Sequence, residues 1–179
     1  MNVLVINAGS SSLKYQLINL EKRDVMAKGI CERVGSDEAF HKHGIDDNEL
    51  VIDTPMKDHD DAMALVLEAL TSGPNKVIDS LDEIDAVGHR IVQGGKYFDS
   101  SVFIDEDVIE KIDELAELAP LHNKAALMGI HACKKTMPDK PMVAVFDTSY
   151  FQTLPQKAYM YPIPYELYEK YSLRKYGAH

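Results

Sequence analysis

The most constraining feature of the sequence is residues 3–20, VLVINAGSSSLKYQLINL, in which a short polar segment separates two strand-like runs. Residues 3–6 are all apolar and mostly β-branched, a pattern typical of a buried strand. Residues 13–20 alternate loosely between apolar and polar side chains, which indicates a second strand. Because only small or polar residues lie between the runs, the sequence predicts a β-hairpin with serines and a glycine at its tip.

The hairpin tip has the composition of a phosphate-binding turn. Gly9 allows backbone N–H groups to approach a ligand closely, and the serine hydroxyls can donate to phosphoryl oxygens. Lys14 adds a compact positive charge, and the amide oxygen of Asn7 suits a magnesium ion or its water shell. The spacing is not that of a P-loop, and a strand rather than a helix follows. On these residues alone, a solvated turn is an equal alternative.

Length and charge restrict the class of protein. At 179 residues the chain can bury one sizeable core, or form one domain and the start of another. Its net charge of −10 argues against a general binder of nucleic acid or anionic membranes, so any anionic ligand needs a local positive site. No apolar stretch reaches spanning length. The two cysteines, Cys31 and Cys133, form no CxxC pair and predict reduced structural thiols in a cytoplasmic protein.

Apolar periodicity predicts the remaining elements. Further strands are expected at residues 25–34, 39–43, 49–52, 84–92 and 142–146. Helices are expected between a cap at Asp58 and the stop at Ser72-Gly73-Pro74, at 105–119 ended by Pro120, at 123–136 ended by Pro138, and at 165–171. Three strands followed by alternating helices and strands favour an α/β domain with a mixed sheet.

Polar residues with possible chemistry follow two of the later strands. Arg90 precedes a double glycine within residues 88–95, and it suits a carboxylate or phosphate, although a structural ion pair is the commoner role of an arginine. Asp147 ends an apolar strand, where α/β sheets collect ligands, but it could equally cap a turn. The terminal His179 carries no signal by itself.

Together these segments resemble the acetate kinase family. The resemblance runs along the whole chain, with the motifs in the family's order and spacing, and it rests on residues 7–14, 89–95, 118–123, 145–148 and 176–179. The sequence departs from the family pattern at Gln93, at Ser149-Tyr150-Phe151 and at Ala178. Because many members have phenylalanine in place of Ala178, this last departure predicts a changed wall of the acyl pocket.

The resemblance implies an actin-like ATPase, or ribonuclease H-like, fold with a mixed sheet and flanking helices, in which a β-hairpin binds phosphate. Family members are about twice as long. The expected organisation is therefore a first domain at residues 1–149 and the truncated beginning of a second at 150–179. The adenosine-binding segments would lie beyond this chain. We expect the chain alone to be inactive and the full-length enzyme to be a cytoplasmic homodimer.

The activity implied by the resemblance is reversible phosphoryl transfer from ATP to acetate, giving acetyl phosphate and ADP, with Mg²⁺ accompanying ATP. By the same resemblance, Arg90 would bind the acetate carboxylate, while Val92 and Leu121 would pack against its methyl group. His179 would hydrogen-bond the transferring phosphoryl group. Asp147 is a catalytic candidate that could orient Arg90 or the metal's waters; a base role is less expected because acetate is already deprotonated at neutral pH.

The hairpin residues complete the implied site. Asn7 would meet the magnesium ion, and the phosphates would be bound by Ser10, Ser12 and Lys14. No nucleic acid or membrane partner is expected.

Two other functions stay open. A propionate or butyrate kinase would share most of these residues, although Val92 favours acetate because a smaller residue would suit a longer acid. A non-catalytic domain that binds anions weakly is the second alternative. A sugar kinase or actin-like ATPase would share the hairpin but gives no reason for Arg90 and His179.

Overall fold

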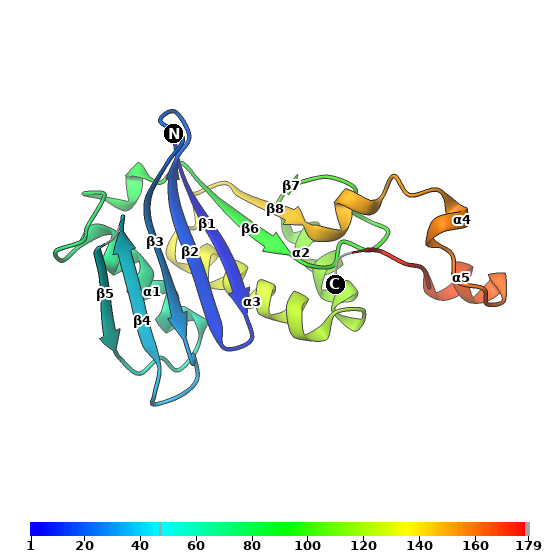
Figure 1. Ribbon diagram of the computed structural model, residues 1–179, viewed down its shortest axis with the longest axis horizontal. Coiled ribbons are helices and arrows are strands. Elements are labelled where there is room, and N and C mark those ends of the chain that lie inside the picture. The colour runs from blue at the N-terminus through cyan, green and yellow to red at the C-terminus, as the bar shows by residue number, and fades with distance from the viewer. Residues whose placement is uncertain (47, 178–179) are drawn as a thin grey trace.

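One mixed β-sheet organises the chain, and the computed structural model describes residues 1–46 and 48–177 of it (Figure 1). In this part of the chain eight strands have the order β5-β4-β3-β2-β1-β6-β8-β7. Their bounds are β1 Asn2–Gly9, β2 Ser12–Asn19, β3 Asp24–Glu32, β4 Phe40–Ile45, β5 Asn48–Asp53, β6 Ala86–Ile91, β7 Val102–Phe103 and β8 Met142–Phe146. The mixed sheet and the predicted strands are confirmed, with ends shifted by a few residues, whereas β7 was not predicted.

The sheet has an antiparallel part and a parallel part. Strands β1 to β5 pair antiparallel in sequence order, as connected hairpins do. Strands β1, β6 and β8 run parallel, with Ile6 beside His89 and Arg90 beside Val145. The carboxyl ends of the three parallel strands therefore lie at one edge of the sheet, next to the tip of the first hairpin.

The two long helices lie on the same face of the sheet. They are α1 His59–Thr71 and α3 Pro120–Thr136. The buried apolar side chains of α1, together with Ala132 and Cys133 of α3, form one cluster with β1 and β2, whereas Ala126, Leu127 and Ile130 of α3 belong to a second cluster with α2 (Glu106–Glu114) and β8. Asp58 caps α1 as predicted, because its side chain accepts hydrogen bonds from the backbone N–H groups of Asp60 and Asp61. Smaller elements are α2 Glu106–Glu114, α4 Gln156–Tyr159, α5 Tyr165–Tyr171 and the 3₁₀ turns η1 Leu81–Glu83, η2 Leu115–Glu117 and η3 Asp147–Phe151.

Pro120 does not end a helix, contrary to the sequence prediction. It is the first residue of α3, which therefore starts three residues earlier than the predicted 123–136. A proline fits this position because the first helical N–H has no partner within the helix. The predicted helix at 105–119 instead ends as α2 at Glu114 and continues into η2.

Helix α3 approaches β1 very closely at Gly129. A Cβ atom built on Gly129 would lie 2.9 Å from the Cβ of Ala8, which is shorter than real side chains tolerate. The absent side chain thus allows α3 to support the hairpin strand just before its tip.

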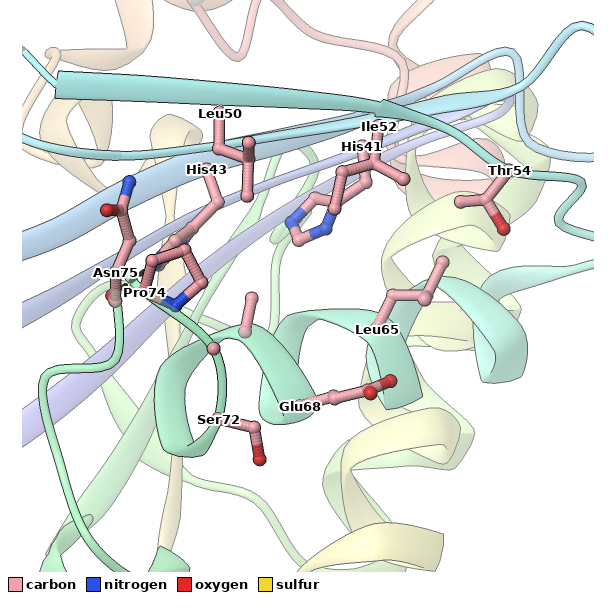
Figure 2. A pocket seen from close by; sticks show the side chains of 12 residues that line it. His41, His43, Leu50, Ile52, Thr54, Leu65, Glu68, Ser72, Pro74 and Asn75 are labelled. Carbon is pink, nitrogen blue, oxygen red and sulfur yellow. Dashed lines mark hydrogen bonds between the residues drawn. The ribbon is translucent and has the colours of Figure 1, made fainter.

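A cavity of about 290 Å³ lies near the edge of the sheet formed by β5, between α1 and strands β4 and β5 (Figure 2). His41 and His43 on β4 face it from the sheet, and Leu65 and Glu68 on α1 face it from below in this view. The cavity shares no lining residue with the one near Arg90 described below.

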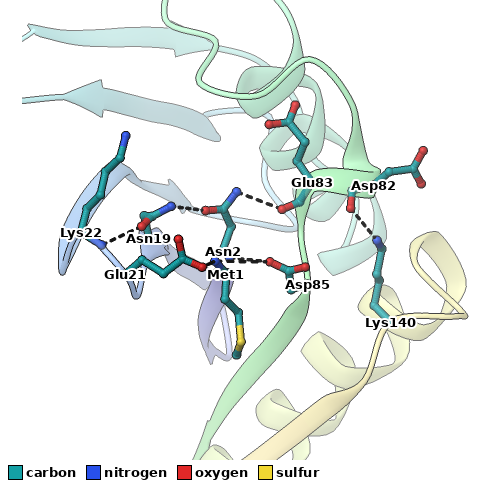
Figure 3. A network of polar contacts seen from close by, with 9 residues as sticks. All are labelled: Met1, Asn2, Asn19, Glu21, Lys22, Asp82, Glu83, Asp85 and Lys140. Carbon is teal, nitrogen blue, oxygen red and sulfur yellow. Dashed lines mark hydrogen bonds and ion pairs between the residues drawn. The ribbon is translucent and has the colours of Figure 1, made fainter.

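Polar contacts fix the register of β1 at its amino end (Figure 3). The backbone N–H of Asn2 donates to Oδ2 of Asp85 at 2.6 Å, and its side-chain amide donates to the carbonyl of Glu83 at 3.0 Å. Asn19, at the end of β2, donates to Oδ1 of Asn2 at 2.7 Å. These bonds tie β1 to both neighbours, and the resulting register places Asn7 beside Arg90 at the opposite end.

The remaining sequence expectations concern the cysteines and the membrane. Cys31 and Cys133 are free and buried, in agreement with structural thiols, and burial raises the pKa of each to about 12. Among the described residues, no helix combines the length and apolarity needed to span a bilayer.

Candidate functional site

Three side chains, on or directly after the three parallel strands, meet at the carboxyl edge of the sheet. Arg90, near the end of β6, donates from Nε to Oδ1 of Asp147 at 3.0 Å and from Nη2 to Oδ2 at 2.7 Å. Its Nη1 donates to Oδ1 of Asn7 on β1 at 3.5 Å. Since the registers of β1, β6 and β8 fix these positions, the order Asn7–Arg90–Asp147 follows from the sheet itself.

Asp147 binds one particular side of the Arg90 guanidinium. Asp147 occupies the side of the guanidinium formed by Nε and Nη2, so the hydrogen bonds raise the pKa of Arg90 above its ordinary value. Within the described residues, the end of the guanidinium formed by Nη1 and Nη2 makes no contact with an acceptor apart from the long bond to Asn7 and the bond from Nη2 to Asp147. The Arg90 side chain keeps 42% of its surface exposed, so this end can still bind a planar anion such as a carboxylate.

The hairpin tip is a two-residue turn whose central residues are Ser10 and Ser11. The ladder of β1 and β2 closes at Gly9 and Ser12, so the N–H groups of the two central serines lie outside it. A Cβ atom on Gly9 would lie 2.8 Å from Oγ of Ser12, so a larger residue here would require the Ser12 side chain to rotate.

His59 ties this hairpin to helix α1. Its Nε2 lies 2.8 Å from the carbonyl oxygen of Gly9, and because a carbonyl only accepts, this nitrogen carries the hydrogen. His59 is only 4% exposed, so the hairpin tip is held by a buried contact and not merely by its own turn.

A cavity of about 180 Å³, called the hairpin cavity below, lies between the hairpin and Arg90. It is lined by hairpin residues and by residues that follow β6 and begin α3; these are Asn7, Ala8, Gly9, Ser12, Lys14, Arg90, Val92 and His122. Within the described part of the chain, Lys14 forms no ion pair. The cavity therefore has uncompensated positive charge and hydroxyl and amide groups, the surroundings that an anion needs.

A second, open cavity of about 250 Å³ continues from Val92 along the start of α3, where it is lined by Leu121 and His122. The buried Asn123 fixes its wall. Oδ1 of Asn123 accepts the N–H of Gln93 at 3.1 Å, and its Nδ2 donates to the carbonyl of Gln93 at 2.9 Å. This reciprocal pair holds the segment after β6 against α3.

The predicted site residues fall into three groups. The structure brings Asn7, Ser12, Lys14, Arg90 and Val92 to one cavity, and Asp147 contacts Arg90 directly. Ser10 is exposed at the tip, and Leu121 is 73% exposed beside Val92. His179 lies outside the described residues.

Sequence reasoning missed His122 and Asn123 as residues of the site. Both belong to the segment 118–123 that carried part of the family resemblance, and that segment was the available signal. His59 was also missed, because no local pattern shows that a helix will start against the hairpin carbonyl.

The oxygen donors near the hairpin suit magnesium only in part. Within residues 1–46 and 48–177, no group of three or more His, Cys, Asp or Glu side chains could hold a metal ion. Asn7 and Asp147 supply amide and carboxylate oxygens, but both contact the Arg90 cation. This set fits an ion that keeps several waters and takes its other ligands from substrate phosphates, as Mg²⁺ does.

Comparisons with known proteins agree with this geometry. The family model described as the acetokinase family matches residues 2–179. An acetate kinase from Thermoanaerobacterium thermosaccharolyticum is 56% identical over the whole chain, which covers 45% of that relative. The crystal structure of Porphyromonas gingivalis acetate kinase matches 99% of the chain with a TM-score of 0.95 and 43% identity, and 45% of that structure is covered.

A propionate kinase from Francisella tularensis has the same fold, with a TM-score of 0.92 and 38% identity over 99% of this chain and 45% of that one. The chain thus spans a little under half the length of the relatives it matches.

Proposed function

The chain belongs to the acetokinase family and has its actin-like ATPase fold. From this premise we propose that it forms the part of an acetate kinase that contains the phosphate-binding hairpin and the acetate-binding site. The reaction is reversible phosphoryl transfer from ATP to acetate, giving acetyl phosphate and ADP. The observation that carries the proposal is the alignment of Asn7, Arg90 and Asp147 beside the hairpin cavity.

Acetate binds at the free end of the Arg90 guanidinium. Asp147 holds the Nε and Nη2 side, so Nη1 and the outer hydrogen of Nη2 present two parallel donors to a carboxylate. Val92 lines the same cavity and receives the methyl group, and Leu121 lines the adjoining cavity on the other side of Val92. Asp147 is then a positioning residue, because acetate has no proton to lose at neutral pH.

The phosphates bind at the hairpin. Lys14 neutralises charge on the phosphoryl oxygens, while the hydroxyls of Ser10 and Ser12 and the N–H groups at the tip donate hydrogen bonds that orient them. Mg²⁺ bound with ATP would supply charge neutralisation, and Asn7 is the residue that would meet it. His122 lines the cavity between hairpin and Arg90, so we add it to the groups that contact the reacting centre. His179 keeps its proposed role at the transferring phosphoryl group.

Both reactants are anions, so the main tasks of these residues are to screen repulsion and to hold donor and acceptor in line. Residues 150–179 begin a second domain in this proposal, and the adenosine site belongs to the part of the family's length that this chain does not span. ATP, ADP, acetate and acetyl phosphate are the partners, and the complete enzyme is a cytoplasmic homodimer.

A chimera tests the proposal. In it this chain replaces the matching 45% of the Thermoanaerobacterium relative, and the product from acetate and Mg-ATP is trapped with hydroxylamine. We expect acetyl hydroxamate from the chimera and none above background from the 179-residue chain alone. A folded chimera without turnover would overturn the proposal, and preferred turnover of propionate or butyrate would move it to the second candidate. Turnover by the chain alone would refute the proposal that the adenosine site lies in the part of the family's length that this chain does not span.

A further inference from the structure

The cavity between α1 and strands β4 and β5 has a hydrogen-bond acceptor that no group among the described residues uses. His41 lines it and is only 3% exposed, and its ring lies beneath β5 in Figure 2. Its Nε2 lies 3.0 Å from the hydroxyl oxygen of Tyr15. Within the described residues, its Nδ1 has no hydrogen-bond partner, and it is not sealed in the core as Nε2 of His89 is.

The neighbouring hydrogen bonds determine which nitrogen of His41 is free to accept. Nε2 of His43 lies 2.8 Å from the carbonyl oxygen of Asn75, so in the neutral ring it carries the hydrogen and Nδ1 is an acceptor. Tyr15 must then donate its hydroxyl hydrogen to that Nδ1, at 2.6 Å. The Tyr15 oxygen therefore accepts from Nε2–H of His41, and Nδ1 of His41 presents its lone pair to the cavity.

The neutral state of His41 is set by its surroundings. Burial, and next the neighbouring His43, lower its pKa to about 4. At neutral pH the Nδ1 atom is consequently an acceptor and not a donor, so a ligand at this position must bring an N–H or O–H group.

The charges at the rim select a cation. Glu68 projects from α1 at the edge of the cavity, and within the described residues its carboxylate pairs with no cation. The cavity also adjoins the carboxyl end of α1, whose last turn has no basic residue. A helix carboxyl end carries partial negative charge, so both features attract positive charge.

The rest of the lining is apolar. Leu50 and Ile52 cover the cavity from β5, Leu65 and Ala69 line it from α1, and Pro74 closes one side. The volume of about 290 Å³ is enough for a small ring or short chain.

We propose that this cavity binds a small protonated amine with an apolar body. The ammonium group donates to Nδ1 of His41 and faces Glu68, and the apolar body packs between Leu65 and Ile52. The site lies apart from the cavity beside Arg90 and does not depend on the proposed phosphoryl transfer.

Benzylamine, with benzyl alcohol as its neutral counterpart, tests this proposal on the 179-residue chain. Titration followed by NMR should give benzylamine a dissociation constant of about 1 mM, the range expected for so few atoms. The long-range ¹H–¹⁵N signal of Nδ1 in His41 should shift during the titration. Benzyl alcohol should bind several-fold more weakly, and Glu68→Gln should weaken benzylamine about two- to fivefold.

Two α1 variants locate the binding. Ala69→Leu fills the cavity and should abolish binding, whereas Ala64→Leu, an exposed change on the same helix, should leave it unchanged. Equal binding of amine and alcohol would refute the cationic assignment. Binding that survives Ala69→Leu, or no binding at about 10 mM benzylamine, would refute the site.

Discussion

Asp147 accepts hydrogen bonds from Nε and Nη2 of Arg90, at 3.0 and 2.7 Å, and so fixes the plane of the guanidinium at the carboxyl edge of the sheet. The two residues are separated by 57 positions in the sequence, and they meet because β6 and β8 are parallel neighbours. The orientation leaves the Nη1 and Nη2 end towards the hairpin cavity. The proposed acetate site follows from this geometry.

The first prediction concerns the role of Asp147. If it positions Arg90, Asp147→Asn in the chimera should lower kcat/KM for acetate about tenfold, since asparagine offers the guanidinium one acceptor oxygen in place of two and carries no negative charge. The shape of the pH–rate profile should stay unchanged, because no catalytic proton is lost. Asp139→Asn, the same change at an exposed residue, is the control. Complete loss of turnover together with loss of the acidic limb would identify Asp147 as a base.

The second prediction concerns the close approach of α3 to the hairpin. Gly129→Ala should lower the free energy of unfolding by about 1–2 kcal/mol, because the new methyl group would overlap the Cβ of Ala8. Gly88→Ala is the matched control on β6, where an added Cβ meets nothing within 4 Å. It should be neutral or slightly stabilising. Urea denaturation measures both, and an equally stable Gly129→Ala would contradict the packing described here.

The third prediction is a loss of stability in mild acid. Burial lowers the pKa of His41 and of His89 to about 4, against 6.5 in the unfolded chain. Between these two pKa values the unfolded state therefore binds more protons than the folded state. The stabilisation that the neutral histidines give the fold above pH 6.5 is consequently lost as the pH falls towards 4. Between pH 7 and pH 5 each histidine should cost about 2 kcal/mol of unfolding free energy.

Variants separate this effect from general acid sensitivity. His89→Leu should reduce the loss between pH 7 and pH 5 by about half, whereas His131→Gln at an exposed position should leave it unchanged. An identical loss in all three proteins would show that these buried histidines do not control the acid response.

Local patterns predicted much of the fold and part of the site. Strand periodicity and the Asp58 cap are short-range features, and they agree with the structure. Pro120 misled the prediction because proline suits both the position after a helix and the first position of a helix. The two-residue β7 is too short to show any periodicity.

The residues that the sequence did not reveal act through distant contacts. His59 reaches Gly9 across 50 positions, and Asn123 clamps Gln93 across 30. Such pairs depend on how α1 and α3 pack on the sheet, and nothing in the local sequence specifies that packing. That Asn7, Lys14 and Arg90 line one cavity could be anticipated because each lies near a strand end of unusual polar composition, and their roles there stay predictions.

The most direct test of the central claim is the kinetic behaviour of Arg90 variants in the chimera, measured with acetate and hydroxylamine. Arg90→Ala should raise the KM for acetate and lower kcat, a combined loss of about 1.5–3 kcal/mol in transition-state stabilisation. Arg90→Lys should rescue little, because an ammonium group cannot present two parallel donors. Arg33→Ala, which removes an exposed ion pair with Glu38, is the control and should have no effect. Unchanged acetate kinetics in Arg90→Ala would make Arg90 a structural partner of Asp147 and would contradict the proposed acetate site.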